Sequence, residues 1–177
     1  MVCLSSHAEC TAPSGAVECR SRTTETVMRR YISLFVFLGL TTLVAIIAGA
    51  FPPGEWYEAL SKPEWTPPNW VFGPVWSLLY LFIAIAGWLV WRSKGLGLAL
   101  LFWLAQLVLN GLWSYFMFGQ NQIDSAMIDI SLLWLAIAGF ILTSWRVSRL
   151  AALLFVPYLA WVSFAAALNL AVLQLNI

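Results

Sequence analysis

The side chains best suited to chemistry in this chain are polar and aromatic residues placed at helical spacing inside long apolar runs. One run carries Gln106, Asn110, Trp113 and Met117, separated by four, three and four positions. This spacing puts all four on one face of a helix. Amides are costly inside a membrane, so those retained there indicate hydrogen bonding to another helix or to a ligand.

Two further apolar runs carry stripes of the same kind. Their members are Tyr158, Trp161, Ala165 and Asn169 in the last run, and Phe72, Trp76, Tyr80 and Ile83 in the second. If the runs alternate in direction, Trp76, Trp113 and Trp161 lie at one depth near the same side. We expect the stripes to wall a cavity suited to a large, flat, apolar ligand. Alternatively, the amides join helices and the rings form interfacial belts.

One carboxylate lies inside an apolar run. Asp129 is about a turn and a half into the fourth run, and Asp124 stands at its start. A carboxylate costs ~2.5–3.5 kcal/mol at full depth and less near the interface. No Lys or Arg lies at that depth, so we expect Asp129 to be protonated or to accept hydrogen bonds from Asn110, Trp113 or a ligand. A functional and a structural role are both open.

The motifs of common enzyme classes are absent from the sequence. It contains no glycine-rich phosphate loop, no HExxH and no Ser/His/Asp set, and its single histidine lies outside the apolar runs. We therefore expect no catalytic residue, no bound metal and no required cofactor.

The elements that position these residues are membrane helices. The chain is 62% hydrophobic and 10% charged, with a mean hydropathy of +0.84, whereas a soluble domain is about 25% charged. The apolar runs cover about residues 31–51, 71–91, 96–118, 123–145 and 150–173. Each can span a bilayer as a helix, and none alternates as barrel strands do. We predict an all-α domain over 31–177, a bundle of five transmembrane helices in which short connections join antiparallel neighbours.

The connection 52–70 between the first two runs is unusual in composition. The segment from Pro52 to Trp76 holds six of the eight prolines and four of the eleven tryptophans. A disordered linker is poor in aromatic residues. We predict a folded lid or wall to which Trp56, Tyr57, Trp65 and Trp70 offer flat faces.

The basic residues indicate an orientation. Eight of the nine fall on one side of the predicted spans, namely Arg20, Arg22, Arg29, Arg30, Arg92, Lys94, Arg146 and Arg149, and Lys62 alone falls on the other. By the positive-inside rule the N-terminus is cytoplasmic and the C-terminus lies outside, for a bacterial inner membrane.

Residues 1–30 differ in character from the rest. Cys3, Cys10, Cys19 and His7 could form a metal site, but their spacing matches no zinc pattern. The other interpretation is a disordered tail, or a start assigned too early, because Met28 is followed by two arginines and an apolar run.

Several long motifs resemble the tryptophan-rich sensory protein family, also called the translocator protein or peripheral-type benzodiazepine receptor family (TspO/MBR). They are WYEAL, PEWTPPNWVFGPVWSLLY, LVLNGLWSYFMFG and VPYLAWVSFAAALNLAVLQLN, and the resemblance covers residues 31–177. It implies a homodimeric five-helix membrane protein that binds porphyrins such as protoporphyrin IX and haem, and in animal members cholesterol and drugs. Family pocket positions carry over to Tyr57, Phe72, Trp76, Tyr80, Asn110, Trp113, Asp129, Trp161, Ala165 and Asn169.

The resemblance also implies a function. Bacterial relatives are described as sensors or translocators in tetrapyrrole and stress regulation, and light-dependent porphyrin breakdown is proposed for some. The expected partners are a porphyrin, the lipid membrane and a second copy of the chain, with no nucleic acid. No basic residue follows Arg149, so the sterol motif of animal members is incomplete. A non-transporting membrane scaffold is the remaining alternative.

Overall fold

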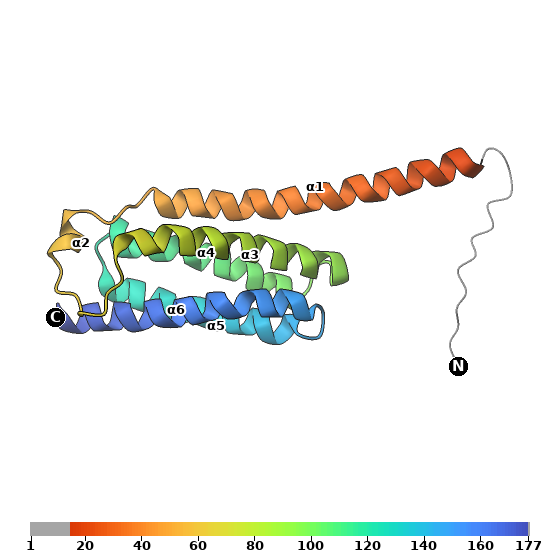
Figure 1. Ribbon diagram of the computed structural model, residues 1–177. Coiled ribbons are helices and arrows are strands. Elements are labelled where there is room, and N and C mark those ends of the chain that lie inside the picture. The colour runs from red at the N-terminus through yellow and green to blue at the C-terminus, as the bar shows by residue number, and fades with distance from the viewer. Residues whose placement is uncertain (1–14, 177) are drawn as a thin grey trace.

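Helices form the whole regular structure of the described part of the chain, and five are long and apolar enough to cross a membrane (Figure 1). The computed structural model describes residues 15–176, with the side chains of Met28 and of residues 31–176. Its elements are α1 (Gly15–Gly49), α2 (Glu55–Ala59), η1 (Asn69–Val71), α3 (Phe72–Lys94), α4 (Leu98–Ser114), η2 (Tyr115–Gly119), α5 (Ile123–Ser144) and α6 (Arg149–Leu175). The predicted all-α membrane bundle is confirmed.

The first helix starts earlier than the sequence predicted. α1 begins at Gly15, so residues 15–30, predicted as part of a disordered tail, continue the first membrane helix. Neither proline nor glycine occurs between residues 16 and 30, so nothing in the backbone interrupts the helix there. The remainder of the predicted tail, with Cys3, His7 and Cys10 as possible metal ligands, lies outside the described residues, as does the side chain of Cys19.

The five long helices are arranged as a ring in the order α1, α3, α6, α5 and α4. α4 packs along α5 and α5 along α6, as their short connections predict. α3 and α4 have few close backbone approaches, because α1 lies against both. They meet instead through long side chains, and the buried Trp103 indole donates a 2.8 Å hydrogen bond to the Ile83 carbonyl. The neighbour prediction therefore holds only in part for this pair.

The two ends of the bundle differ in charge. α2, the α5 N-terminus and the chain's C-terminus share one end, which we call the loop end (Figure 1). The α3–α4 and α5–α6 connections share the other, which we call the basic end, because Arg92, Lys94, Arg146 and Arg149 lie at the helix ends and connections there. The aromatic stripes of α3, α4 and α6 lie toward the loop end.

Candidate functional site

A chain of hydrogen bonds joins the three predicted stripes. The Tyr80 hydroxyl of α3 donates to Asn110 Oδ1 of α4 at 2.7 Å, and Asn110 Nδ2 donates to the Tyr158 hydroxyl of α6 at 3.0 Å. Asn110 and Tyr158 are buried, with 3% and 0% of their surface exposed. Helical spacing alone put these residues on inward faces, and the network shows that the faces meet. A single amide at the centre therefore fixes the relative positions of three helices.

Aromatic rings of α3 and α6 pack on one side of this network. Trp76 lies 5.4 Å from Tyr80 and 6.2 Å from Tyr158 between ring centroids. One turn nearer the loop end, Phe72 contacts Trp161 edge to face at 5.7 Å. Edge-to-face pairs at this separation are favourable. These contacts extend the polar network into a continuous aromatic wall.

A second group of rings is built by η2, a widened turn that continues α4. Its backbone is closed by the Gln120 N–H, which donates to the Tyr115 carbonyl at 2.9 Å. Such π turns break the regular helical rotation and often occur at functional sites. Here the turn places Phe118 between Trp113, at 5.6 Å, and Tyr57 of α2, at 5.3 Å, both edge to face.

The Pro/Trp-rich connection is folded onto the loop end, as predicted. Asn176 holds it from the end of α6, since its Oδ1 accepts from the Ser61 N–H at 3.0 Å and its Nδ2 donates to the Ser61 carbonyl at 2.9 Å. Trp65 adds an edge contact to Phe164 at 5.7 Å. Trp70 is the exception, because 76% of its surface is exposed. It offers its face outward and not to the site.

Four polar atoms near these rings are buried without a hydrogen-bond partner in the described structure. They are the indole N–H groups of Trp113 and Trp161 and the acceptors Asp129 Oδ2 and Asn169 Oδ1. The expected pairing of Asp129 with Asn110 or Trp113 does not form, since Asn110 is committed to the two tyrosines. Unpaired buried groups cost ~1–3 kcal/mol each, so water or a ligand that pairs with them is strongly favoured.

The remaining predicted residues have supporting roles. Asn169 is buried and its Nδ2 donates to the Ile123 carbonyl at 3.2 Å, which ties α6 to the start of α5. Ala165 is half-buried against the core. Tyr57 is half-buried, with the Lys62 ammonium 4.7 Å from its ring centroid, and burial raises the pKa of its phenol above the usual value. The phenol is therefore neutral at physiological pH.

Sequence reasoning left three contributors out of the site. Tyr158 was read as part of a stripe, yet it is the buried hub of the network. Its position at the head of that stripe was the available signal. Phe118 and Phe164 carry rings of the loop end. Phe118 projects from a π turn, which α-helical spacing cannot represent.

The rings of the site contact one another, and two hollows of about 370 Å³ each lie elsewhere. One is at the basic end. The other lies on the outer surface of α1, α3 and α4, lined by apolar side chains such as Val36, Leu40 and Leu104. A large ligand at the aromatic site must therefore part the rings or lift the folded loop.

The described residues provide no metal centre. They contain no group of three or more His, Cys, Asp or Glu side chains close enough to hold an ion. The polar resources of the site are thus hydroxyls, amides, indole N–H groups and one carboxylate, which suit recognition more than group transfer.

The sequence was compared with protein families and with curated proteins. The model of the TspO/MBR family matches residues 34–175. Protein CrtK of Rhodobacter capsulatus is 39% identical over 153 residues, which cover 82% of this chain and 94% of that protein. Tryptophan-rich protein TspO of Chlorobaculum tepidum is 38% identical over 84% of this chain and 98% of its own length. The human translocator protein is 38% identical, over 76% of this chain and 85% of its own length. This chain is therefore a multi-pass integral membrane protein that belongs to the TspO/MBR family.

Proposed function

We propose that this protein binds a porphyrin among the aromatic rings at the loop end and acts as a tetrapyrrole sensor or translocator. The observation that carries the proposal is the convergence of the α3, α4 and α6 stripes on the Tyr80–Asn110–Tyr158 network. Relatives of this chain bear the names tryptophan-rich protein TspO and translocator protein, which supports a sensing or translocating role.

The chemistry of the site suits a flat macrocycle with polar edges. The faces of Trp76 and Trp161 offer stacking area, and most of the affinity comes from buried apolar surface. The unpartnered indole N–H groups of Trp113 and Trp161 are donors, and the two propionate carboxylates of protoporphyrin IX or haem are acceptors. Binding through ring faces and edges requires no ligand to the central metal, so the metal-free porphyrin and haem both fit.

Transport and sensing both need this site reached from one side of the membrane. With the basic end cytoplasmic by the positive-inside rule, the folded loop faces outward and covers the aromatic rings. We further propose that the chain works as a homodimer, since membrane helices with exposed small residues, such as Ala105 and Ala167, allow close approach between copies.

Titration of the purified protein with protoporphyrin IX, followed by tryptophan fluorescence quenching, tests the proposal. Loss of one ring contact is worth ~0.5–1.5 kcal/mol beyond area, so Trp76→Ala and Trp161→Ala should each weaken binding at least several-fold. Trp145→Ala is the matched control, because this indole is 47% exposed beyond the end of α5. Equal affinity in all four proteins would reject the site.

An enzymatic alternative rests on one geometric observation. The Trp76 ring lies 5.4 Å from the redox-active Tyr80 phenol, close enough to share an oxidising equivalent from a photoexcited porphyrin. Illumination of porphyrin with the protein, and with Trp76→Phe, is compared with porphyrin in empty micelles under the same oxygen. Identical products and rates in protein and micelles would remove this alternative.

A further inference from the structure

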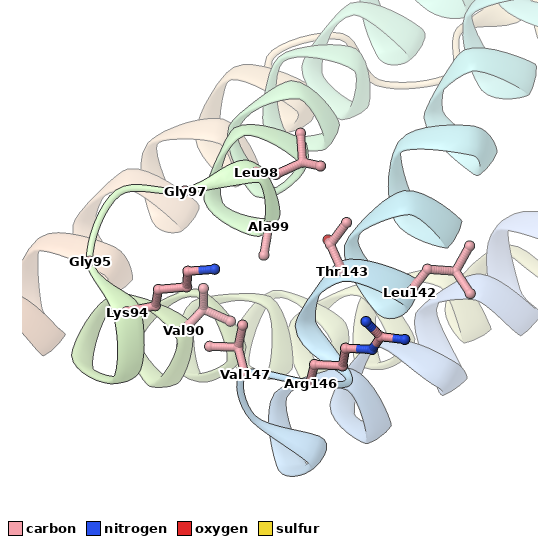
Figure 2. A pocket seen from close by; sticks show the side chains of 10 residues that line it. All are labelled: Val90, Lys94, Gly95, Gly97, Leu98, Ala99, Leu142, Thr143, Arg146 and Val147. Carbon is pink, nitrogen blue, oxygen red and sulfur yellow. The ribbon is translucent and has the colours of Figure 1, made fainter.

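A second site lies at the opposite end of the bundle. A hollow of about 370 Å³ is enclosed there by the last turn of α3, the α3–α4 connection, the first turn of α4 and the end of α5 (Figure 2). Its walls are apolar toward the membrane, where Leu98 and Leu142 are 60% and 75% exposed. Its polar lining is dominated by two cations, Lys94 and Arg146.

The two cations reach the hollow from different helices. Figure 2 shows the Lys94 ammonium pointing inward between Val90 and Ala99, and the Arg146 guanidinium lying beside Thr143 and Leu142. No acidic residue occurs in the sequence between Glu64 and Asp124 or after Asp129. Within the described part of the chain neither cation has an ion-pair partner. Two uncompensated positive charges therefore flank one cavity.

The first turn of α4 adds a third positive element. Its N-cap is Gly97, in extended backbone (φ −176°), and no side chain caps the helix. The leading N–H groups of this 17-residue helix are thus left for an outside acceptor. The approach to the cap is made by Gly95, whose φ of +68° suits glycine. The Thr143 hydroxyl already donates to the Gly139 carbonyl, so the anion would be held by charges and amides.

We propose that this hollow binds the phosphate of an anionic phospholipid headgroup. Lys94 and Arg146 flank the phosphate, the start of α4 donates to it, and the acyl chains lie along the exposed Leu98 and Leu142. The hollow stands at the ends of membrane spans, at the depth of a headgroup, which favours a lipid over a soluble anion. This site is separate from the aromatic rings and does not rest on the proposed porphyrin binding.

Native mass spectrometry of the full chain in neutral detergent tests the site. The apparent Kd of the first bound lipid is measured for phosphatidylglycerol and for zwitterionic phosphatidylcholine. We expect phosphatidylglycerol to bind more tightly, with Lys94→Gln or Arg146→Gln weakening it about fivefold and the double variant about thirtyfold. Arg92→Gln and Arg149→Gln are matched controls, because both lie at the basic end outside the hollow. They should keep the selectivity.

Gly97→Asp separates occupation of the site from misfolding. A Cβ at Gly97 meets only the Lys94 side chain, at 4.0 Å, so the new carboxylate fits, caps the α4 amides and occupies the anion's place. Headgroup selectivity should be lost while the unfolding temperature is kept or raised. Equal affinity for both lipids in the unsubstituted protein, or equal loss in all four single charge variants, overturns the proposal. Displacement of bound phosphatidylglycerol by inorganic phosphate at matched ionic strength in chloride would overturn the assignment to a lipid.

Discussion

The amide of Asn110 should hold the bundle together by acting through Tyr158. Replacing Asn110 with Ala removes two hydrogen bonds, from Tyr80 and to Tyr158. Hydrogen bonds between membrane helices average ~0.6 kcal/mol and reach ~1.7 kcal/mol. The two lost bonds therefore predict a fall of roughly 1.2–3.4 kcal/mol in the free energy of unfolding.

A double-mutant cycle isolates the bond to Tyr158. Asn110→Ala, Tyr158→Phe and the double variant are unfolded reversibly in mixed micelles of mild detergent and dodecyl sulfate. Since Tyr158→Phe deletes only the hydroxyl, the double variant should be more stable than the sum of the single effects predicts, by roughly 0.6–1.7 kcal/mol.

A distant pair serves as the control for this cycle. Ser163 lies on the exposed face of α6 and accepts a hydrogen bond from Trp134 at 2.8 Å, outside the network. Asn110→Ala and Ser163→Ala should therefore add within about 0.5 kcal/mol. If Asn110→Ala and Tyr158→Phe were equally additive, the amide would not act through the tyrosine and the reasoning from the network would be wrong.

Three further results are expected from other parts of the structure. Gly87→Ala should lower stability by about 1–3 kcal/mol by overpacking the buried indole of α4, whereas Gly111→Ala, whose Cβ would meet Val44 at 3.8 Å, should not; parallel unfolding midpoints check this. Asn176→Ala removes both bonds to Ser61 and should speed protease cleavage and hydrogen exchange in the loop, with unchanged rates counting against the clamp. Burial raises the pKa of Tyr57, so loop docking gains stability that is complete below about pH 10 and lost as pH rises through the folded pKa; Tyr57→Phe should abolish this alkaline loss of protease protection.

The membrane spans and their inward faces could be predicted from the sequence because both follow from local patterns. Continuous apolar runs of about 20 residues define the spans, and spacing of three and four placed Asn110, Tyr80 and Tyr158 on inward faces. The packing of α1 against both α3 and α4 could not be predicted in this way. It depends on side-chain shape, such as the space that Gly87 leaves for Trp103, and no periodicity encodes that fit.

The contents of the site were predicted better than its internal contacts. The stripes named most of the rings correctly, but they did not show that Asn110 is used by two tyrosines and leaves Asp129 Oδ2 without a partner. Hydrogen-bond partners across helices depend on axial offsets of an ångström or two, and residue spacing along one helix carries no information about these. The π turn that carries Phe118 is missed for a related reason, since it changes the rotation per residue.

The contacts at the loop end also constrain how a ligand could enter. The Phe72–Trp161 and Tyr57–Phe118 ring pairs close the aromatic wall from two directions, and each belongs to a different support. Phe72 and Trp161 are carried by membrane helices held below them by the Asn110 network, whereas Tyr57 is carried by a five-residue helix, α2, in the loop that Asn176 clamps. The clamp has two exposed hydrogen bonds, each worth only ~0.5–1.5 kcal/mol. Lifting the loop therefore costs less than separating α3 from α6, and we expect entry beneath the loop, so Asn176→Ala should raise both the association and the dissociation rate of protoporphyrin IX while changing its Kd little.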